Sequence, residues 1–292
     1  MIQLLTGRGG LPEIHIQNRG GRCEICLMGA HVLSFIPAGH REVFFLSEKS
    51  EYSPVGKAIR GGVPICWPWF GPADTAKIPG ATTSHGFIRQ VFWNVSSWKE
   101  LGDEQTEVEL QAEDTPETRA IWPHAFRIAM KIRVGKALEM TLTTINTGDQ
   151  EFSYQQALHS YYAVGDCHDL SITGFQGCSF KDKAPADPPA PNPQPGDITI
   201  TAETDRVYFH CPGESDILDP VMGRRIRIEK WNSDTGVVWN PWIAKSRRMP
   251  DFGDEEYRNM VCVENCNVDY DGKTLKPGES HALTVRISVE AL

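Results

Sequence analysis

Residues 125–143 read AFRIAMKIRVGKALEMTLT, and apolar and polar side chains alternate along two runs within them, residues 125–134 and 138–143. Alternation with a period of two places every second side chain on the same face of a strand. One face of such a strand is buried and the other is polar, which is typical of an antiparallel sheet. The stretch therefore predicts two strands of an antiparallel sheet.

The same alternation recurs along the chain, in residues 13–17, 106–111, 197–201, 224–230 and 280–289. Turn-forming residues separate many of these runs, at residues 146–149, 233–236, 270–273 and 276–278. Helix signals are few: they predict a short helix at residues 115–122 and one helical turn at residues 254–259. No alternation of strands with helices and no nucleotide-binding glycine motif occurs. The chain is therefore predicted to be all-β.

The composition favours a large, soluble β protein. The chain has 292 residues, 40% of them hydrophobic, and its formal net charge is -9. A protein of this length buries a sizeable core. Its acidity argues against nucleic acid or an anionic membrane as the main partner. The N-terminus lacks the charged and apolar segments of a signal peptide, so we expect a cytoplasmic protein, and we also expect a monomer.

A proline-rich stretch, APADPPAPNPQPG at residues 184–196, interrupts the strand pattern. Proline at this density favours extended, unpaired backbone. The sequences on both sides share the same alternation. We therefore expect a surface loop inside a single domain spanning residues 1–292 rather than a linker between domains. Shortening residues 184–195 is expected to leave the stability nearly unchanged.

The eight cysteines are scattered over the chain, unlike those of a compact disulfide framework. CEIC at residues 23–26 and CVENC at residues 262–266 have spacings that a zinc site would tolerate, but both segments are typical of strands and lack the glycines of zinc knuckles. We therefore expect reduced, partly buried thiols and no metal.

Two segments, RGGVPICWPWFG at residues 60–71 and SHGFIR at residues 84–89, combine arginine, histidine, tryptophan and glycine. Arginine suits planar or anionic groups, tryptophan suits the apolar faces of sugar rings, and glycine allows backbone to approach a ligand. One interpretation is therefore the wall of a pocket for a small, polar, anionic ligand. The other is that the glycine and proline pairs only build tight turns between strands.

A histidine and a glutamate are candidates for acid–base chemistry. His159 lies among aromatic residues, and Glu264 interrupts an otherwise apolar strand, where a carboxylate is costly unless it is paired or functional. If the two side chains meet, mutual attraction is expected to raise the pKa of the histidine and to lower that of the carboxylate. A protonated acid would then face an ionised base. The alternatives are a core histidine with its hydrogen bonds satisfied and a glutamate paired with a structural arginine.

Eight motifs in order carry a resemblance to a known family: RGGVPI at 60–65, WPWFG at 67–71, HGFIR at 85–89, LHSYY at 158–162, ETDRVY at 203–208, VWNPW at 238–242, DFGDEEY at 251–257 and VCVEN at 261–265. With them the chain resembles the hexose-6-phosphate mutarotase (glucose-6-phosphate 1-epimerase) branch of the aldose 1-epimerase family, from about residue 30 to the C-terminus. The resemblance implies the galactose-mutarotase-like β-sandwich (supersandwich), in which large antiparallel sheets pack face to face.

The resemblance also implies a reaction and a set of residues. His159 matches the general acid that protonates the sugar's ring oxygen, and Glu264 matches the general base that deprotonates the anomeric hydroxyl. No cofactor or metal is implied. The positions that match the family's substrate contacts, or lie in the same motif, are Arg60, Ser84, His85, Arg89 and Asp205. Relatives often carry glutamine where this chain has Ser84, which puts one contact in doubt. Lys57 and Lys245 are further candidates to hold a phosphate.

Three other functions stay open at this point. An aldose 1-epimerase for free sugars is disfavoured by the basic residues near the motifs. A non-catalytic phosphosugar-binding module has no need of a matched proton donor and acceptor. A polysaccharide-active enzyme on a related sandwich would more often be secreted.

Overall fold

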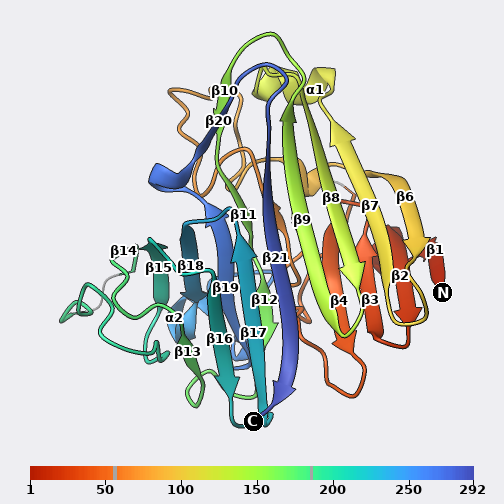
Figure 1. The fold of residues 1–292 in the computed structure, drawn as a ribbon. Coiled ribbons are helices and arrows are strands. Elements are labelled where there is room, and N and C mark those ends of the chain that lie inside the picture. Colours follow the sequence, from red (N-terminus) through yellow and green to blue (C-terminus); the bar gives the residue numbers. More distant parts are fainter. Residues whose placement is uncertain (55–57, 185–186) are drawn as a thin grey trace.

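The computed structural model describes residues 1–54, 58–184 and 187–292, and it is built mainly from antiparallel strands (Figure 1). The α-helices among these residues are short: α1 (Pro116–Ile121) and α2 (Trp242–Ser246). Four 3-10 turns complete the helical content, η1 (Arg8–Gly10), η2 (Ile88–Gln90), η3 (Glu256–Asn259) and η4 (Asp269–Asp271). No helix among the described residues is long and apolar enough to cross a membrane.

The largest sheet has eight strands, in the order β13-β16-β17-β21-β9-β8-β7-β6. These strands are β6 (Asn94–Glu100), β7 (Thr106–Glu113), β8 (Phe126–Val134), β9 (Ala137–Asn146), β13 (Ser171–Thr173), β16 (Glu214–Asp219), β17 (Arg224–Trp231) and β21 (Ser280–Ala291). Along β8 and β9 every second side chain is buried, so one face of this sheet contacts the core and the other contacts solvent.

A seven-stranded sheet carries Asp205 and Glu264, and His159 directly follows one of its strands. Its order is β14-β15-β18-β19-β11-β5, and β12 also pairs with β19. Its strands are β5 (Ile65–Cys66), β11 (Gln156–Leu158), β12 (Tyr161–Ala163), β14 (Phe180–Asp182), β15 (Thr204–Phe209), β18 (Thr235–Asn240) and β19 (Met260–Asn267). Every residue of β18 and β19 is buried, so these central strands are covered on both faces.

The remaining strands form a four-stranded sheet and a short pair. The sheet contains β1 (Ile2–Thr6), β2 (Pro12–Asn18), β3 (Gly21–Cys26) and β4 (His31–Pro37), in that order, and the pair contains β10 (Phe152–Tyr154) and β20 (Lys273–Leu275). β3 contacts β8, and β19 contacts β21. The four-stranded and the seven-stranded sheets therefore lie against the same buried face of the eight-stranded sheet (Figure 1).

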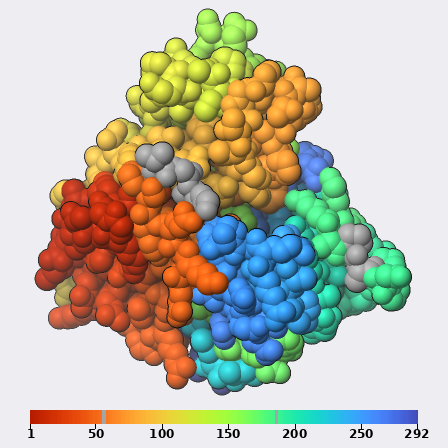
Figure 2. Space-filling model, turned by 180° about the vertical axis from the view of Figure 1, so that it is seen from behind, coloured from red at the N-terminus to blue at the C-terminus, as the bar shows by residue number. Residues whose placement is uncertain are grey.

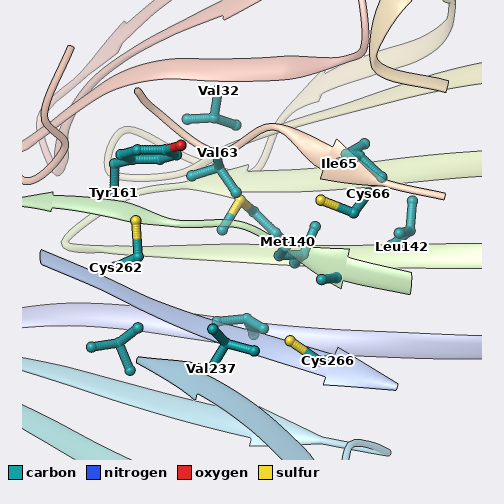
Figure 3. Packing of buried hydrophobic residues seen from close by; sticks show 14 of the residues in the cluster. Val32, Val63, Ile65, Cys66, Met140, Leu142, Tyr161, Val237, Cys262 and Cys266 are labelled. Carbon is teal, nitrogen blue, oxygen red and sulfur yellow. The ribbon is translucent and has the colours of Figure 1, made fainter. Parts of the chain in front are cut away.

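The hydrophobic core fills the space between the sheets (Figure 3). Met140 and Leu142 of β9 extend from the eight-stranded sheet toward Val63, Val237 and the cysteines of the seven-stranded sheet. Burial of this apolar surface, at roughly 25 cal/mol per Å², is the main source of stability. All eight cysteines are buried free thiols.

The structure confirms most of the predicted strands. The alternating runs at 13–17, 106–111, 125–134, 138–143, 224–230 and 280–289 correspond to β2, β7, β8, β9, β17 and β21. The predicted helix at 115–122 is α1, capped by Thr115, and the turn at 254–259 contains η3. The fold class is thus all-β, as expected.

The strand predicted at residues 197–201 is wrong. Only Ile198 pairs, through an isolated bridge to Ile172 in the three-residue strand β13. Ile198 and Ile200 are both buried, which explains the alternation. The short neighbouring strand offers no longer ladder to which these residues can bond.

The proline-rich segment is partly tied to the protein. Asn192 exchanges two hydrogen bonds with the backbone of Phe180, at 3.2 and 2.7 Å. Gln194 is buried and accepts a hydrogen bond from the Tyr208 hydroxyl at 3.1 Å. We therefore expect the stability to stay nearly unchanged only if the shortening ends before Asn192.

Candidate active site

A hollow in two connected lobes lies on the face seen in Figure 2, where segments far apart in the sequence meet. The lobes have volumes of about 520 and 470 Å³, and Arg60, His85, His159 and Tyr161 line both. The arginine lobe is also lined by Ser84, Arg89 and Asp251. The carboxylate lobe is also lined by Phe70, Lys183, Asp205, Trp239, Lys245 and Glu264. Cavities of this size suit a small polar ligand.

His159 and Glu264 meet at the junction of the two lobes. His159 follows β11, where the chain leaves the sheet before β12, and its backbone N–H donates to the Pro64 carbonyl at 3.0 Å. Glu264 lies in the middle of β19. His159 Nε2 is 3.4 Å from Glu264 Oε1, and the two residues are only 8% and 2% exposed. The two side chains, which the sequence alone could not place together, therefore meet in the structure.

The predicted protonation of this pair is wrong for the unliganded protein. Burial lowers the pKa of His159 well below its usual value, and neighbouring positive charges act in the same direction. Burial raises the pKa of Glu264 well above its usual value; Asp205 adds to this shift, whereas Lys183 and Arg89 oppose it. Desolvation thus outweighs the attraction within the pair. Both shifts favour the neutral form of each side chain, with a proton on Glu264 rather than on His159.

His85 is held as a neutral hydrogen-bond donor. Its Nδ1 accepts a hydrogen bond from the backbone N–H of Gly71 at 3.2 Å, so its remaining proton lies on Nε2. Burial and the charges of Arg89, Lys183 and Arg60 lower its pKa to about 3. His85 therefore donates, and does not titrate, near neutral pH.

The glycine before Phe87 is required by a close approach of backbone. A side chain at Gly86, which has a φ of +73°, would place its Cβ 1.8 Å from the Trp67 carbonyl oxygen. Gly86 therefore allows the segment that carries His85 to lie against the segment of Trp67. The turn-building interpretation of this motif is correct for the glycine, alongside the pocket-wall interpretation for the histidine.

Arg60 is fixed by a buried ion pair and a phenol. Its Nε and Nη2 donate to Asp251 Oδ2 at 3.2 and 3.0 Å, and its Nη1 donates to the Tyr161 hydroxyl at 2.9 Å. A guanidinium has five N–H groups, so two remain for a ligand. The neighbouring Gly61 is anchored by His31, whose Nε2 lies 2.7 Å from its carbonyl oxygen.

Arg89 has a different environment from Arg60. Its Nη2 donates to the Ser84 carbonyl at 2.8 Å, and no carboxylate pairs with it among the described residues. Its Nε is buried without a hydrogen-bond partner there. Ser84 contributes this carbonyl while its own side chain is exposed. In the arginine lobe, no carboxylate from residues 1–54, 58–184 or 187–292 thus pairs with Arg89.

Two lysines and an aspartate line the carboxylate lobe. Lys245 pairs with Glu203 at 3.0 Å and lies 3.7 Å from Asp205. Lys183 lies over the Phe70 ring, with Nζ 4.8 Å from its centroid, and has no ion-pair partner in the described part of the chain. Burial raises the pKa of Asp205, and Lys183 and Lys245 oppose that shift. This lobe therefore combines acceptors and donors suited to hydroxyl groups.

The prediction that Trp67 and Trp69 form the pocket wall is wrong. Trp67 is fully buried and packs against Trp122 and Phe126, and Trp69 packs against Phe87 in the core. Neither lines the hollow. Trp239 of β18 does line the hollow, and its indole ring can contact the apolar face of a sugar in the carboxylate lobe.

All seven residues proposed from the sequence line the hollow: Arg60, Ser84, His85, Arg89, His159, Asp205 and Glu264. Lys245 does so as well, whereas Lys57 lies outside the described residues. Sequence reasoning missed Tyr161, Lys183, Trp239 and Asp251. Tyr161, Trp239 and Asp251 lie within motifs that had been noted, so those motifs were the available signal.

Two groups with metal-ligand side chains lie outside the residues that line the hollow. One contains Glu13, His15 and Glu24, and the other contains Asp166, Cys167 and His168. Arg8 pairs with both glutamates of the first group, and Arg258 lies 3.7 Å from Asp166 in the second. These arginines compensate the carboxylates, so neither group points to a metal.

Comparison with known proteins connects this geometry to one family. The sequence model described as "Aldose 1-epimerase" matches residues 12–288. A protein of Escherichia coli strain K12 named "Putative glucose-6-phosphate 1-epimerase" is 36% identical over 268 residues, which are 91% of this chain and 87% of that protein. The solved structure of "a putative mutarotase" from Salmonella typhimurium superposes with a TM-score of 0.87 at 31% identity, covering 100% of this chain and 97% of that one.

A more distant structure agrees in fold. The "galactose mutarotase-like protein" of Clostridium acetobutylicum has a TM-score of 0.72 at 17% identity and covers 100% of this chain and 99% of its own. The fold of the chain is therefore the galactose-mutarotase-like arrangement of antiparallel sheets.

Proposed function

The chain belongs to the aldose 1-epimerase family, and we propose that it interconverts the α and β anomers of D-hexose 6-phosphates, with glucose 6-phosphate as the first candidate. The observation that carries the proposal is the buried pair of His159 Nε2 and Glu264 Oε1, 3.4 Å apart at the junction of the two lobes. An acid and a base at this separation can address the ring oxygen and the anomeric hydroxyl of one sugar, because both oxygens are bonded to C1.

The reaction needs one proton donor and one acceptor. His159 gives a proton to the ring oxygen while Glu264 removes the proton of the anomeric hydroxyl, so the ring opens to an aldehyde. Rotation about the C1–C2 bond and reversal of the proton transfers close the ring as the other anomer. Acid–base catalysis of this kind supplies about 10²- to 10⁴-fold per group.

The pKa shifts in the unliganded site favour a neutral His159 and a protonated Glu264. A neutral His159 with a protonated Glu264 and an imidazolium with a carboxylate differ only in the position of one proton. The second arrangement is the reactive one, and Lys183 favours it because it lowers the pKa of Glu264, whereas Arg89 lowers the pKa of both side chains. The substrate therefore needs to shift a proton within the pair rather than exchange one with solvent.

The covalent structure of the sugar orients it between the lobes. C5 and C6 follow the ring oxygen, so the phosphate lies on the side of His159 away from Glu264. That side is the arginine lobe, where Arg89 has no carboxylate partner within the part of the chain that the structure describes, and where Arg60 retains two N–H groups. Charge-assisted hydrogen bonds from guanidinium groups suit a phosphate dianion. The C2 and C3 hydroxyls then face Asp205 in the carboxylate lobe.

Anomer exchange measured by magnetisation-transfer NMR tests the proposal, with glucose 6-phosphate and glucose as substrates and with spontaneous exchange subtracted. The wild-type protein should accelerate exchange of the phosphosugar, and Glu264→Gln and His159→Gln should each lose about 100-fold or more. Arg89→Gln should weaken the preference for the phosphosugar. Acceleration of neither sugar would overturn the proposal, and equal acceleration of both would favour a free-sugar epimerase.

A further inference from the structure

The orientation of His159 is not set by the usual hydrogen bond. The imidazole ring of a catalytic histidine has one nitrogen that reacts and one that does not. A hydrogen-bond acceptor at the unreactive nitrogen commonly fixes the orientation of the ring. His159 Nε2 lies near Glu264, but its Nδ1 is buried with no hydrogen-bond partner among the described residues. Something other than a hydrogen bond at Nδ1 must therefore hold the ring in place.

Three rings surround the imidazole of His159. The Tyr161 ring lies parallel to it, with the centroids 4.7 Å apart and the planes inclined by 9°. Trp239 and His85 contact it nearly at right angles, with centroids 6.1 and 5.8 Å away. Parallel and edge-on contacts are the favoured geometries of ring pairs. The stacked ring restricts tilting of the imidazole, and the two edge contacts restrict its rotation.

Tyr161 is itself held rigidly. It is the first residue of β12 and pairs with Cys262 of β19, two residues before Glu264 (Figure 3). Its hydroxyl accepts the 2.9 Å hydrogen bond from Arg60, and two further donors of Arg60 bind Asp251. Tyr161 is 2% exposed and Asp251 is 6% exposed. The stacked ring is thus fixed at its backbone and at its hydroxyl.

We propose that Tyr161 is a positioning residue, whose stacked ring holds the plane of the His159 imidazole so that Nε2 faces both Glu264 and the ring oxygen of the sugar. This inference rests on the proposed function and deepens it. The Arg60–Asp251 pair completes the arrangement, because the guanidinium that fixes the Tyr161 hydroxyl also lines the arginine lobe. Binding of the phosphate and orientation of the acid therefore share one side chain.

The chain provides a matched control in the next residue. Tyr162 lies on the same strand and is completely buried, but its side chain points to the other face and contacts Phe44, with ring centroids 5.8 Å apart. Replacing either tyrosine by leucine removes the same atoms from the core. Only the Tyr161 substitution removes the ring stacked on His159.

The experiment compares Tyr161→Leu, Tyr161→Phe and Tyr162→Leu with the wild type, by anomer exchange of glucose 6-phosphate over a range of concentrations and by thermal melting. Tyr161→Leu should lower kcat at least about tenfold, with a smaller change in KM, because the acid is misaligned rather than the substrate released. Tyr161→Phe keeps the stacked ring and should recover most of that loss. Tyr162→Leu should lower the melting temperature comparably and keep the wild-type kcat.

Two outcomes would overturn the inference. One is a wild-type kcat for Tyr161→Leu, and the other is an equal loss of kcat in the two leucine variants, which would make the contact purely structural. If Tyr161→Leu does not fold, Tyr161→Met takes its place, because its longer and more flexible side chain adapts to an irregular space. His159→Gln separates the two proposals: full activity of that variant sinks the proposed function, whereas its inactivity beside a fully active Tyr161→Leu sinks only the role of Tyr161.

Discussion

The eight-stranded and the seven-stranded sheets treat their charged side chains in opposite ways. On the solvent face of the eight-stranded sheet, charges pair across strands, as Arg133 does with Glu107 and Glu139 at 2.5 and 3.2 Å. In the seven-stranded sheet, Glu264 Oε2 and Asn265 Nδ2 are buried without hydrogen-bond partners among the described residues. The first sheet pairs its exposed charges across strands, whereas the second leaves a carboxylate oxygen of Glu264 open to a ligand in the hollow, at a cost in stability.

The largest effect on stability is expected in the core face of the eight-stranded sheet. Leu142 of β9 is completely buried, so Leu142→Ala should lower the free energy of unfolding by about 2 to 5 kcal/mol, since it leaves a cavity between the sheets. Urea unfolding measures the loss. The kcat of the folded variant should be unchanged, and a parallel loss of kcat would erase the distinction between the two sheets.

In contrast to Leu142→Ala, Glu264→Gln should raise the free energy of unfolding. The raised pKa of Glu264 means that the folded protein holds this proton more tightly than the unfolded chain does. The contribution of Glu264 is therefore fully present below about pH 4.5 and declines as the pH rises through the folded pKa. Glutamine does not titrate, so the variant should exceed the wild type by about 1 to 3 kcal/mol near pH 8.

Unfolding of Glu264→Gln and the wild type at several pH values checks this sign. The advantage of the variant should shrink toward pH 4.5, where both side chains are neutral. A variant that is less stable than the wild type at every pH would show that Glu264 is a structural carboxylate, like those of the eight-stranded sheet.

A smaller effect is expected for Lys183→Gln. Lys183 lowers the pKa of Glu264, so removing its charge should shift the acidic limb of the activity profile to higher pH. The other titratable or charged groups that act on Glu264 are His159, Asp205 and Arg89, and they are unchanged in this variant. We expect a roughly three- to tenfold loss of rate near pH 6 that disappears at alkaline pH.

Lys245→Gln is the matched control for Lys183→Gln. Lys245 lines the same lobe, but its charge is already paired with Glu203 and lies near Asp205. Its removal should change KM more than the position of the acidic limb. An identical shift in both variants would mean that net charge, rather than the position of Lys183, sets the pH dependence.

The smallest effect is expected on the solvent face of the eight-stranded sheet. Arg286 pairs with Glu229 at 2.5 Å while remaining 43% exposed. Arg286→Gln should cost no more than about 1 kcal/mol in the free energy of unfolding and should leave anomer exchange unchanged, because exposed ion pairs are screened by water. A larger loss, measured by urea unfolding, would show that cross-strand pairing stabilises this sheet more than its exposure suggests.

The same contrast explains which strands could be predicted from the sequence. β8, β9, β17 and β21 have one face in solvent, so their alternation is visible in the sequence. β18 is buried on both faces and shows no alternation, and the short strands β5, β11 and β12 offer too few residues to form a pattern. Regular sheet was therefore predictable, whereas in the sheet that carries the hollow only the apolar strand around Glu264 was predicted.

The candidate site divides in a similar way. His159, Glu264 and the arginines stand out because charged and titratable groups are unusual in apolar or glycine-rich surroundings. In the sequence, Tyr161 and Trp239 resemble ordinary core aromatics, although they line the hollow. Trp67 and Trp69 drew attention in the sequence but are ordinary core aromatics in the structure. Lys183 directly precedes the proline-rich segment, so the sequence indicates a surface loop there rather than a site residue. Orientation and stacking depend on contacts across the fold that no local pattern contains.

The eight buried thiols can serve as internal probes of local unfolding. Burial raises the pKa of every cysteine, so none is a reactive thiolate while the fold is closed. A thiol reagent can therefore label a cysteine only when the chain around it opens. Cys23 and Cys26 would report the opening of β3, Cys66 that of β5, and Cys262 and Cys266 that of the strand that carries Glu264. Labelling followed by mass spectrometry would thus time the opening of the four-stranded and the seven-stranded sheets separately.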